Sequence, residues 1–270
     1  MKWLTNFLNS FWVSGNITGN NNKVIGVRNN NIFYIYRKHK DTKIKINGEN
    51  NEIIINYDNV HGKIKVVLPK RVNLSITGNN NKIHIDMPIR FSHSSIILKG
   101  DGNTFKIGQT KHTVSNAIFC SCDGGNIIIG KDCQMIAGGL FLKIEDDGNV
   151  KHRIEIGDGT NIARECIIRA SDGHTLYDPE THLPLNPPDD IIIGKHCWIT
   201  SRCTLIKGTV LPDNTVVGAN SLVNKKFTEE HTMIAGSPAK IIRRNVFWDE
   251  RGFARYSSDI KNKIIVLGKK

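Results

Sequence analysis

Long apolar runs are missing from this sequence. No stretch approaches the roughly 20 apolar residues that a membrane-spanning helix requires, and the opening segment MKWLTNFLNSFWVSG lacks the continuous apolar run of a signal peptide. Aromatic residues make up only 7% of the chain and are not interleaved with its basic positions. A nucleic-acid-binding surface made of stacking platforms is therefore disfavoured.

Cysteines are also few, six in 270 residues. Without a secretory signal they indicate a reducing compartment rather than a disulfide framework. Cys120 and Cys122 flank Ser121, but a zinc site needs four ligands and the chain offers no second pair of this kind. We expect no bound metal.

Positive charge is abundant and uneven. The net charge is +12, and between Asn16 and His112 sixteen Lys or Arg residues face six Asp or Glu residues, a surplus of ten. A basic surface attracts polyanions over long range, which makes nucleic acid, anionic lipid and acidic polysaccharide the candidate partners. The alternative is a solvated face that keeps the protein in solution.

Residues 193–228 repeat with a period of six. Aliphatic residues open the units: Ile193, Ile199, Leu205, Leu211, Val217 and Val223. The fifth residue of each of the first five units is small: Cys197, Cys203, Thr209, Thr215 and Ser221. Neither a helix nor a hairpin has this period, whereas a parallel β-helix does, because each unit forms one flat face and three faces return the chain to its start. We predict that the openers point into the core and that the small residues turn inward near the corners.

The same period reaches upstream to about residue 126. Aliphatic openers recur at Ile129, Ile156, Ile162 and Ile168, with small partners at Cys133, Thr160 and Cys166. Four of the six cysteines therefore occupy the small inward position, where a small apolar side chain in a tight core is a better interpretation than a catalytic thiol or a metal ligand. Two polar insertions interrupt the repeat, at 144–153 and 171–190, and long ordered loops of this kind are often functional.

The N-terminal half contains a diverged repeat. Its units are ITGNNNKVIG (17–26), INGENNEIII (46–55), ITGNNNKIHI (76–85) and LKGDGNTFKIG (98–108). Glycine and asparagine tolerate the left-handed backbone that tight corners need, and stacked asparagines can bond to one another along the coil direction. The alternation in KIKI (43–46) and KIKV (63–66) places lysines outside as a stripe. We predict irregular β-solenoid coils here, stacked on the six-residue coils.

The predicted organisation has four parts. Residues 1–15 form an N-terminal cap, in which an amphipathic helix over 2–13 covers the end of the solenoid or contacts another subunit, with membrane contact as the alternative. N-terminal β-solenoid coils (16–125), a β-helix domain with its loop (126–240) and a tail (241–270) follow. Gly236 and Pro238 break the strand pattern and predict a helix or hook after them, and 264–268 could add a strand. The fold class is all-β with short terminal helices.

Three segments in this order resemble the hexapeptide-repeat acyltransferases, which have a left-handed β-helix, and most of all their sugar and polysaccharide O-acetyltransferases. The segments are SDGHTLYD (171–178), IIIGKHCWITSRCTLIKGTVLPDNTVVGANSLV (191–223) and AGSPAKIIRRNVFW (235–248). The resemblance covers roughly residues 126–250. It implies acetyl-CoA as donor and a homotrimer with active sites between neighbouring subunits.

The resemblance also implies roles for single residues. His174 matches the catalytic base, Asp172 is placed to orient its ring, and Ser201 matches a position that helps to hold the oxyanion. Thr200 replaces the usual glycine at the pantetheine channel. The positions expected to bind the donor are Trp198, Thr200, Ser201, Ala219, Asn224, Lys225, Lys240 and Arg243.

The sequence thus predicts an acetyl-CoA-dependent O-acetyltransferase that modifies a hydroxyl of a surface glycan, such as an acidic capsular polysaccharide. An N-acetyltransferase for an amino sugar nucleotide and a non-enzymatic glycan-binding solenoid are the alternatives. A metal enzyme is a weaker one, because His152, His174 and His196 are spaced by 22 residues but His196 is not at an inward position. CoA chemistry places the protein in the cytoplasm, and a position near the inner membrane fits glycan assembly there.

Overall fold

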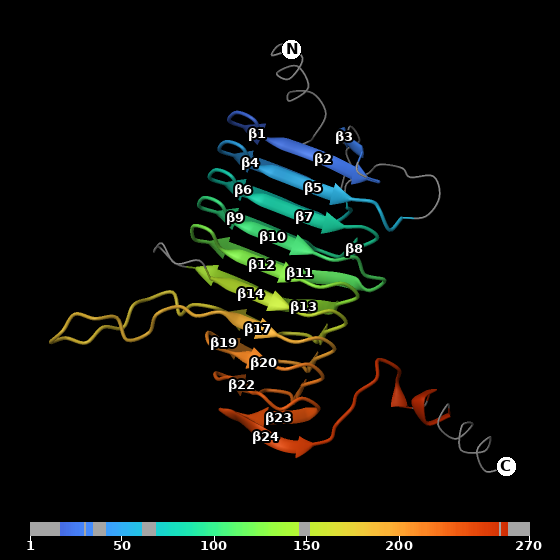
Figure 1. The fold of residues 1–270 in the computed structure, drawn as a ribbon, viewed down its shortest axis with the longest axis vertical. Coiled ribbons are helices and arrows are strands. Elements are labelled where there is room, and N and C mark those ends of the chain that lie inside the picture. The colour runs from blue at the N-terminus through green and yellow to red at the C-terminus, as the bar shows by residue number, and fades with distance from the viewer. Residues whose placement is uncertain are drawn as a thin grey trace.

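The computed structural model describes residues 17–29, 31–34, 42–60, 69–145, 152–253 and 255–258. The predictions for the 2–13 helix, the 63–66 lysines and the 264–268 strand lie outside these residues. Within them the chain winds into a single column of parallel coils, and nearly all of its strands pair in parallel with the coil before and after (Figure 1).

The column has three faces, which the chain visits in the same order in each coil. The first face contains β8 (Arg90–Phe91), β15 (Asn161–Ile162), β18 (Trp198–Ile199), β21 (Val216–Val217) and β23 (Thr232–Gly236). The second contains β1 (Ile17–Thr18), β4 (Lys43–Asn47), β6 (Val72–Thr77), β9 (Ser94–Lys99), β16 (Ile167–Arg169), β19 (Thr204–Ile206) and β22 (Leu222–Val223). The third contains β2 (Lys23–Arg28), β5 (Glu52–Asn56), β7 (Lys82–Asp86), β10 (Thr104–Ile107), β12 (Asn126–Ile129), β14 (Arg153–Ile156), β17 (Ile191–Ile193) and β20 (Val210–Leu211).

Two long strands join the N-terminal coils to the six-residue coils. β11 (Thr113–Ser121) and β13 (Gln134–Glu145) each run along the first face and continue onto the second. The third face also passes without a break from β10 through β12 to β14. The predicted segments 16–125 and 126–240 therefore share one hydrophobic core, and the N-terminal coils wind in the same sense as the later ones.

The predicted inward positions are confirmed. All six openers between Ile193 and Val223 are at most 1% exposed. The small inward side chains donate hydrogen bonds to carbonyls at the corner of the next coil: Cys197 Sγ to Pro212 O at 3.3 Å, Cys166 Sγ to Thr200 O at 3.1 Å. Burial raises the pKa of both Cys133 and Cys197 to about 12, so these thiols are unreactive core donors, as predicted.

A ladder of buried asparagines stabilises the N-terminal coils. Asn51 Nδ2 donates to Asn22 Oδ1 at 3.0 Å, and Asn81 Nδ2 donates to Asn51 Oδ1 at 3.1 Å. The backbone N–H of Asn103 then donates to Asn81 Oδ1 at 2.9 Å. Each ladder side chain thus satisfies backbone groups that the corner would otherwise leave without partners in the core. The predicted stacking of asparagines is confirmed.

A glycine lies three residues before each ladder asparagine, at a point where two coils approach too closely for a side chain. Gly48 has φ +131°, and a Cβ atom there would lie 1.9 Å from the carbonyl oxygen of Gly78. The ladder ends where Asn103 Oδ1 accepts the amide of Gly125 at 2.8 Å and the thiols of Cys120 and Cys122 at 3.4 and 3.5 Å. These two cysteines therefore close the ladder.

Antiparallel pairs lie at the two ends of the column. β3 (Asn31–Tyr34) pairs with β2, and β24 (Ala239–Arg244) pairs with β23 after a turn at Gly236. The helix-or-hook prediction for this segment resolves as a hook, and β24 crosses the predicted boundary at 240. Residues 255–258 are helical. Within the described ranges, no helix combines the length and apolar character that crossing a membrane demands.

The ladder generates a stability prediction. Asn81→Ala removes three hydrogen bonds, which leaves the Gly100 carbonyl and the Asn103 amide buried without these partners. We expect a loss of about 3 kcal/mol in unfolding free energy, measured by denaturant titration. Asn73→Ala, on the outward side of β6, serves as the control and should change it by less than about 0.5 kcal/mol. Equal losses in the two variants would contradict the role of the ladder.

Candidate active site

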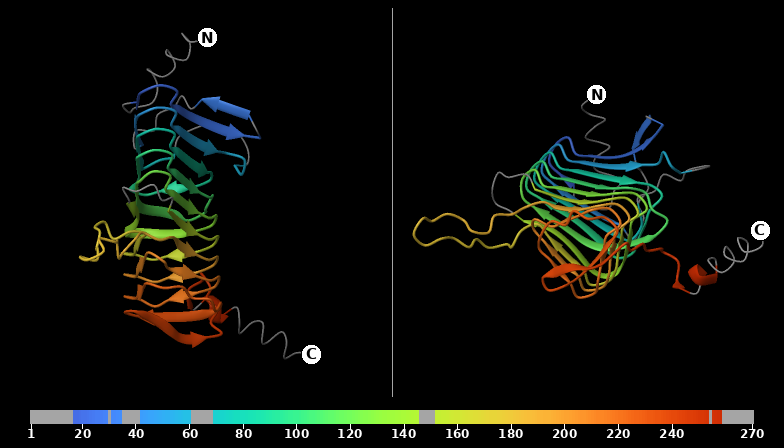
Figure 2. Two further views of the ribbon diagram at one scale, coloured as in Figure 1. Left: turned by 60° about the vertical axis from the view of Figure 1, so that its left-hand side comes forward. Right: turned by 60° about the horizontal axis from the view of Figure 1, so that its bottom comes forward.

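The 171–190 loop is an ordered hairpin that leaves the column between its second and third faces and projects away from it (Figures 1 and 2). The amide of Leu185 donates to Leu176 O at 2.7 Å, and that of Asp178 donates to Leu183 O at 2.9 Å. His174 lies near its base and is exposed. The hairpin therefore presents an imidazole on a defined backbone outside the coils.

A polar clamp fixes the base of this hairpin. Lys207, from the next coil, donates to Asp172 Oδ2 at 2.6 Å and to Asn186 O at 2.7 Å. Asn186 Nδ2 donates to Asp172 Oδ2 and to the carbonyl of His174, both at 2.9 Å. The hydrogen bond from Lys207 holds the pKa of Asp172 below its usual range, so the clamp keeps its charge at neutral pH and loses it only as acid protonates this carboxylate.

The clamp changes the predicted role of Asp172. Among the described residues, no hydrogen bond joins the Asp172 carboxylate to the His174 ring. Its Oδ2 atom accepts from Lys207 and from Asn186 instead. The expectation that Asp172 orients the imidazole directly is corrected: Asp172 holds the backbone that carries His174.

Several predicted donor-binding residues lie at the corner between the first and second faces. Ile199 pairs with Val217 and Val217 with Ile234, so Ser201 and Ala219, each two residues further on, stack on successive coils. Ala219 is exposed and Ser201 is half-buried. Thr200 donates its hydroxyl to Val217 O at 2.6 Å, which turns this side chain toward the next coil.

The C-terminal end of the column carries a basic pocket of about 290 Å³. Its lining includes two predicted donor-binding residues, Lys225 and Lys240, together with Lys226 and Glu229. Arg244 binds Glu229 through two hydrogen bonds, of 2.7 and 3.1 Å, and lowers the pKa of its carboxyl. The one carboxylate is thus neutralised, and the lysines give the pocket a net positive charge suited to phosphate groups. Exposed Asn224 adjoins Lys225, while Arg243, opposite Met233 on the hairpin, is not part of the lining.

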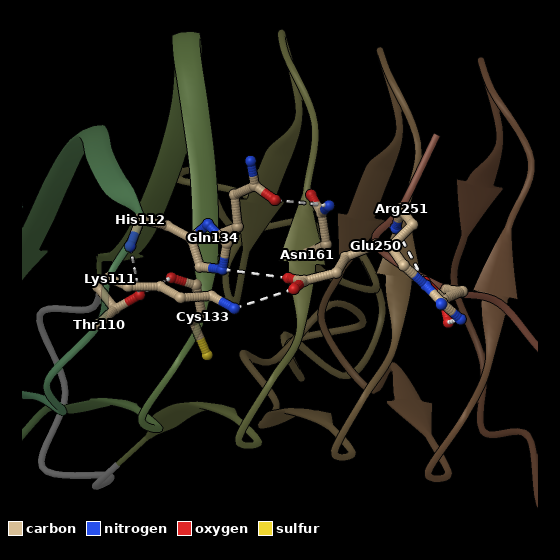
Figure 3. Close-up of polar contacts among 9 residues, drawn as sticks. Thr110, Lys111, His112, Cys133, Gln134, Asn161, Glu250 and Arg251 are labelled. Carbon is tan, nitrogen blue, oxygen red and sulfur yellow. Dashed lines mark hydrogen bonds and ion pairs between the residues drawn. The ribbon is translucent and has the colours of Figure 1, made fainter. Parts of the chain in front are cut away.

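After β24 the chain turns back along the column. Trp248 donates its indole N–H to His196 O at 2.6 Å and stacks on the His196 ring at 4.5 Å between centroids. It also lies 5.9 Å from the ring of Trp198, a predicted donor-binding residue. Glu250 reaches Lys111 at 2.9 Å and His112 at 3.4 Å (Figure 3). The segment therefore crosses several coils of the first face.

A single chain does not bring all predicted catalytic groups together. Ser201 lies at one edge of the second face, and the hairpin that carries His174 leaves from the other edge, roughly 15 Å away at about 3.3 Å per strand residue. His152 and His196 do not join His174 either: His152 is buried and His196 stacks on Trp248. No three His, Cys, Asp or Glu side chains converge among the described residues.

Comparison with known proteins identifies the family of the chain. No family model matches the sequence. A polysialic acid O-acetyltransferase from Escherichia coli O1:K1 is 34% identical over 138 residues, which are 51% of this chain and 43% of that protein. A polysialic acid O-acetyltransferase from Neisseria meningitidis is 31% identical over 190 residues, which are 68% of this chain and 82% of that protein. The chain belongs to this family of O-acetyltransferases.

The solved structures lead to the same family. The crystal structure of the polysialic-acid-specific acetyltransferase NeuO aligns with a TM-score of 0.69 and 28% identity, over 86% of this chain and 99% of that one. The predicted hexapeptide-repeat acyltransferase resemblance and the left-handed β-helix are confirmed. The chain spans 43% of the length of the Escherichia coli relative.

Sequence reasoning missed the clamp and the returning segment. The position of Lys207 could have been predicted from the spacing of stacked residues. Ile168 pairs with Leu205, 37 residues later, whereas Leu205 pairs with Val223, 18 residues later. Removing the 19 extra residues as a loop places Lys207 at the base of the hairpin. Trp248 carried no such signal, because it lies beyond the last repeat.

The clamp generates a prediction about the hairpin. Lys207→Met removes the cation that joins Asp172 to Asn186. We expect the hairpin amides of Asp178 and Leu185 to exchange with deuterium about tenfold faster, while the amides of the coils keep their protection. Lys195→Met, an exposed lysine at another corner, is the control. Unchanged exchange in the Lys207 variant would show that the clamp does not order the hairpin.

Proposed function

We propose that the acetyltransferase transfers an acetyl group from acetyl-CoA to a hydroxyl of an acidic capsular polysaccharide. Family membership carries this proposal, and the ordered hairpin that presents exposed His174, the residue that we propose as the base, supports it. The named relatives act on polysialic acid, which is a polyanion. The net charge of +12 suits an acceptor of that kind.

In the proposed reaction His174 acts as general base. Its free imidazole nitrogen takes the proton of the acceptor hydroxyl while the oxygen attacks the thioester carbonyl of acetyl-CoA. The resulting tetrahedral oxyanion is stabilised at Ser201. The intermediate then expels the CoA sulfur, which receives the proton back from the His174 imidazolium, so that an acetyl ester and free CoA leave the site.

The donor would lie along the C-terminal coils. Exposed Ala219 leaves room for a pantetheine arm beside Ser201, and Asn224 and Lys225 lie on the last coils. The basic pocket that contains Lys225 and Lys240 would hold the phosphates of CoA. Such a donor is made in the cytoplasm, where we propose that the enzyme works, close to the inner membrane where glycans are assembled.

We also propose that the enzyme is a homotrimer. The separation of His174 from Ser201 within one chain supports this, because a neighbouring subunit could bring the two together. The hairpin also exposes four large apolar side chains, whose exposed fractions are about 60%: Leu176, Tyr177, Leu183 and Leu185. A projecting element of this composition is typical of a segment that packs on a partner.

The role of His174 is tested by His174→Asn, which removes the base but keeps a polar side chain of similar size. We expect CoA release with a polysialic acid acceptor to fall at least about 100-fold. His182→Asn, in the same hairpin, should retain activity within about twofold and serves as the matched control. Full activity in the His174 variant would exclude it as the base, and an amide in place of an ester product would indicate N-acetylation.

The shared site is tested by mixing subunits. Ala219→Trp blocks the proposed donor channel at an exposed corner, and His174→Asn removes the base. Each variant alone should be inactive. After co-refolding in equal amounts, about one quarter of the sites in a trimer should pair an intact His174 with an intact donor channel and recover activity. No recovery, with trimers present by light scattering, would place both groups of each site on one subunit.

A further inference from the structure

The second and third faces of the N-terminal coils differ in how their lysines are paired. On the third face Lys23 and Lys82 both approach Glu52, at 3.7 and 3.6 Å. On the second face, strands β4, β6, β9 and β11 contain no Asp or Glu at all. Lys43, Lys45 and Lys99 point outward from this face, and no carboxylate of the described residues forms an ion pair with them.

The acidic side chains at the neighbouring turn are occupied elsewhere. Asp101 Oδ1 accepts a hydrogen bond from the backbone N–H of Asn79 at 2.7 Å, and Asp123 Oδ1 accepts one from the backbone N–H of Asp101 at 2.7 Å. Glu49 accepts from the side chain of Asn20 at 3.2 Å. These carboxylates bind the turns above and below them, and within the part of the chain that the structure describes none of them pairs with Lys43, Lys45 or Lys99.

The strand register connects this face to the His174 hairpin. Lys45 pairs with Ser75, which pairs with Ile97. Ile97 pairs with Phe119, Phe119 with Lys143, and Lys143 with Arg169. The row therefore runs for five coil steps, about 24 Å at ~4.8 Å per step, and ends at the strand that enters the hairpin. There Arg169 donates to the carbonyl of Asp172 at 3.1 Å.

The row and the two lysines beside it carry side chains that can bind a charged sugar polymer. Lys45 and the flanking Lys43 and Lys99 supply cations, and Ser75 supplies a hydroxyl. Phe119 offers an aromatic ring that is half-buried, with Lys99 Nζ 5.3 Å from its centre. Ammonium groups bind carboxylates, and the apolar C–H face of a sugar packs against an aromatic ring by dispersion.

We propose that this row, from Lys45 to Arg169 with Lys43 and Lys99 beside it, is a track that binds an extended anionic polysaccharide and leads it to His174. This inference rests on the proposed function and names the surface that holds its acceptor. A single-stranded nucleic acid would need several stacking rings, and the track has one. A membrane surface would not require a row aimed at the hairpin.

The test compares two variants with the same loss of charge. Lys43→Ala/Lys45→Ala removes two unpaired cations from the track, and Lys23→Ala/Lys82→Ala removes two cations from the third face. Binding of full-length enzyme to long-chain polysialic acid, with dextran as the neutral polymer, is measured by interferometry. We expect the track variant to bind polysialic acid about five- to tenfold more weakly and the control variant to change less than about twofold.

Acetyl transfer to trimeric sialic acid separates this inference from the proposed function. The track variant should keep the turnover of wild type on the trimer but show a raised KM for the long polymer. Equal weakening of binding in both variants, no weakening in either, or absence of wild-type binding to polysialic acid would overturn the track. Tighter binding of DNA or of anionic vesicles through the same lysines would overturn it too. If wild type binds through the track but transfers no acetyl group, the proposed function fails and the track stands.

Discussion

The whole structure depends on the short distance between successive coils. Parallel strands about 4.8 Å apart leave no room for large inward side chains at the corners, and they bury backbone groups there that need partners. The chain meets both demands with the same residues. In the N-terminal coils Asn51 and Asn81 bond to the coil on either side. In the C-terminal coils Cys197 and Thr215 fill the corner and donate to a backbone carbonyl.

This constraint also determines where chemistry can reside. Side chains inside the column are committed to packing, so reactive groups have to lie at corners or on insertions. The corner between the second and third faces holds the asparagine ladder first and the His174 hairpin later. Strict stacking of the following coil then brings Lys207 under the hairpin, where it binds Asp172 and Asn186. Regular coils thus position an irregular loop.

The sequence alone was sufficient for features that repeat. The period of six gave the inward role of Leu205 and Cys203, and the Gly-Asn turns gave the ladder, because each rests on local geometry that every coil must satisfy. Contacts that occur once were not predictable in this way. Asp172 was expected to face the His174 ring, but its carboxylate binds Lys207, which lies 35 residues further along the chain. Trp248 stacks on His196 across 52 residues without any periodic signal.

A solenoid allows acceptor binding and catalysis to be specified separately. Each added coil extends the three faces without disturbing the corner geometry at Ser201 or the hairpin, since a coil contacts only its neighbours. The continuous register from Lys45 to Arg169 means that backbone hydrogen bonds alone align residues on early coils with the coil that carries the His174 hairpin. An enzyme that modifies a long polymer can therefore gain contacts with its acceptor by lengthening the column.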